Sequence, residues 1–221
     1  MKVGVIGSGA VGKALASGFL KHGHTVMCAS RDPSKLEGWK AEAGPRASVG
    51  TPAEAARWGE LLVLAVKGSG AEEAVRTCGI ENLAGKTVID TTNPIADAPP
   101  EDGVIRFFTG LDGSLMERLQ RLAPEARFVK SFSCVGNALM VDPVLEGGPP
   151  TMFMCGNDEG AKREVQQMLE DFGWEWEDLG AATAARAIEP LCILWCIPGF
   201  LRDDWAHTYK VLRRRGPAAG P

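Results

Sequence analysis

The sequence has little of what metal centres and acid–base catalysis usually require. Its 221 residues include three histidines and one tyrosine, and none of its six cysteines forms a C-x-x-C pair. Tyr209 is followed directly by Lys210, so no Tyr-x-x-x-Lys dehydrogenase pair exists. Cys192 and Cys196 share a helical face, but no nearby histidine or third cysteine completes a zinc shell. The sequence therefore predicts no metal site, no assigned catalytic residue, and thiols buried in a reducing compartment.

An excess of positive charge and a long apolar run are also missing. Lys and Arg number 24 against 28 Asp and Glu, a net charge of −4, which disfavours nucleic acid as a partner. No apolar stretch reaches the roughly 18 residues of a membrane span. The most apolar run, Leu191–Leu201, suits a buried or interface helix. We expect a cytoplasmic globular protein with neither nucleic acid nor a membrane as partner.

Strand-like and helix-like segments alternate along the chain, which favours an α/β doubly wound, mainly parallel sheet of the Rossmann type. Expected strands are Lys2–Ile6, Thr25–Ala29, Ala47–Gly50, Glu60–Val66, Lys86–Asp90, Arg127–Ser131, Thr151–Cys155 and Trp174–Asp178. Expected helices are Ala10–His22, Pro33–Ala43, one opened by Thr51-Pro52, Ser114–Leu122, Asp158–Phe172, and an apolar stretch Ala181–Ala206 that its prolines divide. We predict a nucleotide-binding domain over 1–130 and a small C-terminal α+β or helical part over 131–221.

The first motif is GSGAVG, which spans Gly7 to Gly12 between an expected strand and an expected helix. In this G-x-G-x-x-G pattern Gly7 permits a tight turn, Gly9 lets the backbone approach a pyrophosphate, and Gly12 lets the helix pack on the strand. The helix N-terminus supplies free N–H groups for the phosphates. A dinucleotide is the predicted ligand. S-adenosylmethionine is disfavoured because no acidic residue ends the second strand.

The second motif is CASRDP, at the end of that second strand. NAD-selective proteins place a carboxylate here for the ribose 2′-OH, whereas this chain has Ser30 and the cationic Arg31. Both residues suit a 2′-phosphate, and Lys35 adds a third contact from the next helix. The alternative is that Arg31 is a solvated turn residue paired with Asp32. We predict NADP rather than NAD, with Asp32 as a helix-entry residue.

Further motifs complete a family resemblance. They include the strand end AVKG, the turn TTNPI, KSFSCVGNALMVDP, CGNDEGAKREVQQMLEDFGWE and ARAIEPLCILW. With the two N-terminal motifs, nearly the whole chain resembles the F420-dependent NADP oxidoreductases. The resemblance implies NADP(H) as cofactor and the deazaflavin F420, or a flavin, as co-substrate. The residues assigned to NADP(H) are Gly7, Ser8, Gly9, Ala10, Val11, Gly12, Ser30, Arg31, Lys35, Ala65, Val66, Lys67, Asn93 and Pro94.

Three functions remain open on the sequence alone. The leading one is hydride exchange between NADP(H) and a ring compound, which needs alignment of two rings rather than a proton donor. The second is reduction of a small carbonyl or imine, with Lys130 or Asp90 as a weak proton relay, although a strand-edge lysine is expected to be solvated. The third is a non-catalytic NADP(H) sensor. The loop Ser133–Val135 departs from the family's usual His or Asn and leaves the acceptor unassigned. The apolar helix predicts a homodimer.

Overall fold

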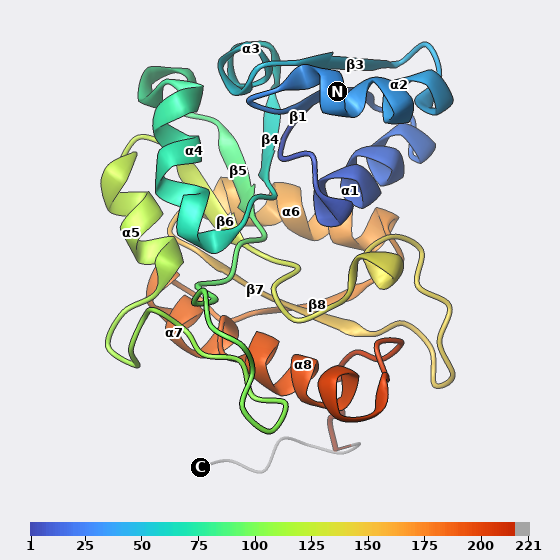
Figure 1. Ribbon diagram of the computed structural model, residues 1–221, viewed down its shortest axis with the longest axis vertical. Coiled ribbons are helices and arrows are strands. Elements are labelled where there is room, and N and C mark those ends of the chain that lie inside the picture. The colour runs from blue at the N-terminus through green and yellow to red at the C-terminus, as the bar shows by residue number, and fades with distance from the viewer. Residues whose placement is uncertain (215–221) are drawn as a thin grey trace.

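A computed structural model describes residues 1–214, and its centre is one eight-stranded sheet (Figure 1). The strands are β1 (Lys2–Ile6), β2 (Thr25–Ala29), β3 (Ala47–Gly50), β4 (Leu61–Leu64), β5 (Thr87–Asp90), β6 (Arg127–Lys130), β7 (Thr151–Gly156) and β8 (Glu175–Asp178). Their order is β3-β2-β1-β4-β5-β6-β7-β8, and the first six are parallel. The predicted Rossmann-type sheet is confirmed.

Helices cover both faces of this sheet, as a parallel sheet requires. They are α1 (Ala10–Lys21), α2 (Glu37–Ala43), α3 (Pro52–Trp58), α4 (Ala71–Cys78), α5 (Leu115–Leu122), α6 (Glu159–Asp171), α7 (Ala185–Ile188) and α8 (Leu191–Arg202). Residues of α1 and α6 share one buried core with the sheet, and residues of α3, α4 and α5 share the other. The central strands β4 and β5 are buried along their whole length, so their apolar runs do not alternate.

The segment after β2 differs from the single helix expected over Pro33–Ala43. A 3₁₀ turn over Pro33–Leu36 comes first, and α2 begins only at Glu37. Asp32 caps that turn by accepting a hydrogen bond from the backbone N–H of Ser34. The short turn keeps the segment beside the end of β2, where the predicted phosphate ligands lie.

The long irregular segment after β5 folds back on itself. Ile95 and Phe107 form one isolated antiparallel bridge, and Glu101 and Val104 form another. Gly103, at a positive φ of 82°, lies against Leu201. The segment therefore reaches from the carboxyl end of β5 to α8 (Figure 1).

The apolar C-terminal stretch is divided, as its prolines predict. Pro190 stands at the start of α8, and Pro198 lies inside that helix. The expectation that no apolar stretch reaches the length of a membrane span was wrong: by length and composition alone, Ala182–Arg202 could cross a membrane, and 33% of its apolar 18-residue window is buried. In the fold it passes the carboxyl edge of the sheet, and Glu189 is buried in a polar network. Core helices of globular proteins meet the same length and composition test.

The boundary predicted near residue 130 falls inside the sheet, between β6 and β7. These two strands are antiparallel and pair only through Val129 with Gly156 and Lys130 with Cys155. Strand β8 then runs parallel to β7. One continuous sheet thus connects the nucleotide-binding strands to the C-terminal helices.

Candidate functional site

A cavity of about 350 Å³ opens at the carboxyl ends of β1, β2 and β4. This is the edge where doubly wound sheets bind ligands. The lining comprises Ile6, Gly7, Ser8, Gly9, Ala29, Ser30, Arg31, Asp32, Lys35, Pro52, Ala65, Val66, Lys67, Gly70, Glu73, Ala74 and Thr77. The structure therefore places both sequence motifs and the end of β4 around one space.

The glycine-rich turn is fixed by close backbone contacts. Gly7 has a φ of 139°, and a Cβ there would lie 2.0 Å from the carbonyl oxygen of Ala65. A Cβ on Gly12 would lie 2.2 Å from the carbonyl oxygen of Gly7. Around a Cβ placed on Gly9, in contrast, no atom lies within 4 Å. Gly7 and Gly12 are thus required by the fold, whereas Gly9 leaves room above the turn for a ligand.

The N-terminus of α1 faces this room without a side-chain cap. Gly9 is the N-cap residue, and the first amide bonded back to it is that of Lys13. The amides of Ala10, Val11 and Gly12 belong to the first turn, where a helix leaves its N–H groups without intrahelical partners. Uncapped donors and the positive end of the helix dipole fit a pyrophosphate.

Asp32 is occupied by local contacts, although it lines the cavity. Its Oδ1 accepts hydrogen bonds from the Ser34 N–H at 3.2 Å and the Ser34 hydroxyl at 2.6 Å. These bonds, the hydroxyl bond first, lower the pKa of Asp32 below its ordinary value. Asp32 thus acts as the cap of the following turn.

Arg31 of the second motif and Lys35 just after it have no carboxylate partner among residues 1–214. Ser30 is held by its N–H to the carbonyl of Gly50 at 3.1 Å, which aims the following residue outward. Arg31 is exposed and lines the cavity, and within residues 1–214 it forms no ion pair, with Asp32 or otherwise. Lys35 likewise has no carboxylate partner in the described part of the chain. The set suits a dianionic phosphate.

The other predicted residues meet at the ends of β4 and β5. The carbonyl oxygen of Asn93 would lie 1.9 Å from a Cβ on Gly68, so the two strand ends touch. The Asn93 side-chain amide donates to the carbonyl of Ser133 at 2.8 Å. Lys67 forms an ion pair with Asp97. Asn93 and its neighbour Pro94 lie beyond the cavity lining, as do the α1 residues Ala10, Val11 and Gly12, and their predicted roles stay predictions.

Sequence reasoning missed the far wall of the cavity. That wall consists of Pro52 at the start of α3 and of Gly70, Glu73, Ala74 and Thr77 in or just before α4. The fold itself could have indicated this wall, because the helix after β4 flanks the ligand crevice in a sheet with this strand order.

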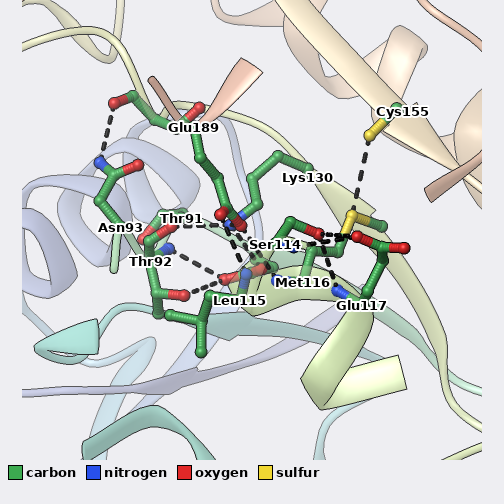
Figure 2. A network of polar contacts seen from close by, with 12 residues as sticks. Thr91, Thr92, Asn93, Ser114, Leu115, Met116, Glu117, Lys130, Cys155 and Glu189 are labelled. Atoms are coloured by element: carbon green, nitrogen blue, oxygen red, sulfur yellow. Dashed lines mark hydrogen bonds and ion pairs between the residues drawn. The ribbon is translucent and has the colours of Figure 1, made fainter. Parts of the chain in front are cut away.

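The sequence also did not predict the buried polar network at the ends of β5 and β6 (Figure 2). Lys130 was expected to be solvated, and this was wrong: its side chain is fully buried. Its Nζ lies 2.7 Å from Asp90 Oδ2 and 3.0 Å from Glu189 Oε1, and it donates to the carbonyl of Thr92 at 2.7 Å. Burial alone would lower the pKa of Lys130, but the charges of Asp90 and Glu189 outweigh it and raise the pKa.

Glu189 connects this network to α5. Its Oε2 accepts from the N–H of Leu115 at 2.9 Å, and its Oε1 accepts from the N–H of Met116 at 3.0 Å. The positive end of the α5 dipole thereby offsets part of the negative charge of the buried Glu189 carboxylate. A buried charge set of this kind persists only when its members are paired and hydrogen-bonded.

Comparison with known proteins identifies a family that this chain matches. Residues 2–94 match the family described as NADP oxidoreductase, coenzyme F420-dependent. A solved structure from Arthrobacter sp. FB24, provisionally assigned as an F420-dependent NADP reductase, superposes with a TM-score of 0.90 at 33% identity, over 96% of this chain and 100% of that chain.

Two curated relatives are similar over part of their length. The F420-dependent NADP reductase of Methanocaldococcus jannaschii is 29% identical over 142 residues, which is 62% of this chain and 61% of that protein. The metalloreductase STEAP3 of Rattus norvegicus is 29% identical over 206 residues, which is 90% of this chain and 39% of that protein. The chain thus spans less than two thirds of both relatives.

Proposed function

The chain belongs to the F420-dependent NADP oxidoreductase family and is an NADP-dependent oxidoreductase, and from that premise we propose that it exchanges a hydride between NADP(H) and a deazaflavin or flavin-like ring compound. One observation carries the nucleotide half of the proposal. Arg31 and Lys35, which form no ion pair within residues 1–214, share a cavity with the glycine-rich turn at the start of α1. A phosphate-selective group and a pyrophosphate cradle at this spacing suit NADP(H).

The proposed division of labour follows the cavity walls. The free amides of the first turn of α1 bind the pyrophosphate, and Ser30, Arg31 and Lys35 bind the 2′-phosphate. The ends of β4 and β5, at Val66 and Asn93, flank the nicotinamide. Bound NADP(H) supplies or accepts the hydride.

The make-up of the cavity supports a ring compound as the second substrate. Among residues 1–214, its lining includes no histidine, tyrosine or cysteine; of the ionisable residues that are present, Asp32 is bonded to Ser34, Lys67 is paired with Asp97, and Glu73 lies on α4. Carbonyl reduction usually needs a general acid. A flavin-like ring takes the hydride directly, so the protein contributes alignment and exclusion of water. Two of the three relatives reported above carry F420-dependent NADP reductase names, and the third is a metalloreductase.

Absorbance at the reduced-nicotinamide band tests the proposal. Protein is mixed with NADPH and, in separate reactions, F420, FMN, and a panel of small ketones and imines. We expect NADPH oxidation with at least one ring acceptor and none with the panel. Turnover confined to ketones or imines would favour the carbonyl or imine reductase. Tight NADPH binding without turnover in any reaction would favour the sensor.

We also propose a homodimer in the cytoplasm. Leu194 and Leu201, which lie two turns apart on one side of α8, are 54% and 59% exposed, and Phe200 is 47% exposed. Apolar side chains that are contiguous on one helix mark an interface, and a second copy can cover them symmetrically. Light scattering after size exclusion at micromolar concentration checks this pairing. A single mass of 23.5 kDa would reject it.

A further inference from the structure

The polar network behind the end of β5 has no place in NADP(H) binding or hydride transfer as described so far. It consists of Asp90, Thr92, Lys130 and Glu189, all buried from solvent; Figure 2 shows how Thr92, Lys130 and Glu189 converge. Three oxygens surround Lys130 Nζ at 2.7 to 3.0 Å: the Thr92 carbonyl, to which it donates a hydrogen bond, and carboxylate oxygens of Asp90 and Glu189 in ion-pair contact. The ammonium is therefore neutralised and held by protein groups, while Asp90 Oδ2 has no hydrogen-bond donor among the described residues.

One side of the network fixes the turn that follows β5. Asp90 Oδ1 accepts from both the N–H of Thr92 at 2.9 Å and its hydroxyl at 2.7 Å, while Lys130 binds the Thr92 carbonyl. The preceding Thr91 donates through its N–H and its hydroxyl to the carbonyl of Leu64, at the end of β4. Thr92 is thus held through its N–H, carbonyl and hydroxyl, directly before Asn93.

The other side fixes the C-terminal helices. Glu189 lies between α7 and α8, immediately before Pro190, and its carboxylate binds both Lys130 and the first amides of α5. From this point α8 packs Cys192, Trp195 and Cys196 against Ile105, which belongs to the segment after β5. The direction of α8 is therefore tied to the same ammonium as the Thr92 turn.

We propose that Lys130 is a positioning residue that holds the Thr92 turn, at the nicotinamide end of the site, in register with the C-terminal helices through Glu189, and that it donates no proton. The inference rests on the proposed assignment of Asn93 and its neighbours to the nicotinamide. The physical reason is stiffness: a buried ammonium with three short contacts resists displacement of any of its partners, because separating one leaves an uncompensated buried group. Hydride transfer is sensitive to such positioning, since a shift of about 1 Å costs roughly a hundredfold in rate.

A matched control exists in the same chain. Lys162 on α6 is also buried and bridges two carboxylates, Glu159 at 2.7 Å and Asp178 at 2.9 Å. Its contacts lie on α6 and β8, away from the cavity lining. Loss of Lys162 therefore measures the cost of removing a covered, paired lysine whose partner Glu159 reaches the surface, at 71% exposure.

The experiment compares Lys130→Met with Lys162→Met. Isothermal titration gives the affinity for NADPH and for adenosine 2′,5′-bisphosphate, which carries only the phosphate and adenine half. Both variants lose thermal stability. We expect Lys130→Met alone to weaken NADPH several-fold relative to the bisphosphate, and to lower kcat about a hundredfold with the ring acceptor. If both ligands keep their affinity ratio in Lys130→Met, the residue is structural only and the proposal fails.

Thr92→Val keeps the test decisive if Lys130→Met does not fold. This isosteric change removes one hydrogen bond to Asp90 and keeps the ion pairs. The expected result is the same change in affinity ratio on a smaller scale, and an unchanged ratio overturns the proposal. Because the ratio needs no turnover, a wild-type protein inactive with every ring acceptor would sink the proposed function and leave this inference measurable.

Discussion

The two ends of the site are built by opposite means. At the phosphate end the decisive contacts are local: Asp32 bonds to Ser34 two residues away, and the cations are exposed and free within the described chain. At the nicotinamide end the contacts are buried and distant in sequence, with Lys130 bonded to Thr92 across 38 residues and Leu115 to Glu189 across 74. The phosphate end leaves its groups for the ligand, whereas the nicotinamide end uses its groups to hold its own shape.

The largest expected effect comes from the glycine-rich turn at the phosphate end, where one glycine is required by the fold and another is left for the ligand. Gly12→Ala places a Cβ 2.2 Å from a backbone oxygen, so α1 must shift and the free energy of unfolding falls by about 3 kcal/mol. Gly9→Ala meets no atom within 4 Å, so the fold is kept while NADPH affinity falls more than about tenfold. Thermal unfolding and NADPH fluorescence titration separate the two. Wild-type affinity in Gly9→Ala would mean that no ligand approaches this turn.

The second effect tests whether the phosphate end is purely a ligand site. Arg31→Ala removes a charge-assisted contact of about 1.5–3 kcal/mol, so NADPH affinity falls roughly 10- to 100-fold while NADH affinity and the melting temperature stay unchanged. Lys40→Ala, an exposed change on α2, is the control. If Arg31→Ala leaves NADPH binding intact, the second motif is an ordinary turn.

A third effect depends on pH and concerns Glu117 on α5, beside the polar network of the nicotinamide end. Glu117 accepts hydrogen bonds from Arg186 and from the Ser114 hydroxyl. These bonds, that of Arg186 first, lower the pKa of Glu117 from 4.5 to about 2. A lowered folded-state pKa contributes stability above pH 4.5 that is lost as the pH falls toward 2. We expect about 1 kcal/mol at neutral pH, because Arg186 is solvent-exposed. Glu117→Gln should therefore be less stable than wild type at pH 7 and equal to it near pH 2 in thermal melts. A gap that persists at low pH would assign the effect to packing rather than to charge.

The smallest effect sharpens the assignment of Asp32. Asp32→Ala removes the cap of the 3₁₀ turn, so the melting temperature falls slightly. NADPH affinity stays near that of wild type, and NADH affinity does not fall. A marked loss of NADH binding would show instead that Asp32 holds a ribose hydroxyl.

How far the sequence predicts this protein follows from the same contrast. The strands and helices of the mainly parallel sheet, the glycine turn and the place of Arg31 at the end of β2 follow from short motifs and alternating elements, because local geometry decides them. Lys130 could not be placed, since its partners Asp90 and Glu189 lie 40 and 59 residues away in the printed chain. Only the topology shows that these carboxylates meet at one edge. Pro52 and Thr77 were only partly predictable. The rule that ligands bind at the carboxyl ends of the strands points to the helices that carry them, but not to these residues.

The two-pair junction between β6 and β7 limits how the enzyme can be shortened. A fragment ending at residue 130 would keep every predicted nucleotide ligand, yet it would turn β6 into an open edge strand that can template aggregation. It would also lose Glu189, leaving Lys130 and Asp90 without the helix that covers them. The minimal nucleotide-binding unit of this chain is therefore larger than its nucleotide-binding residues, and engineering of a cofactor module should retain the sequence through α8.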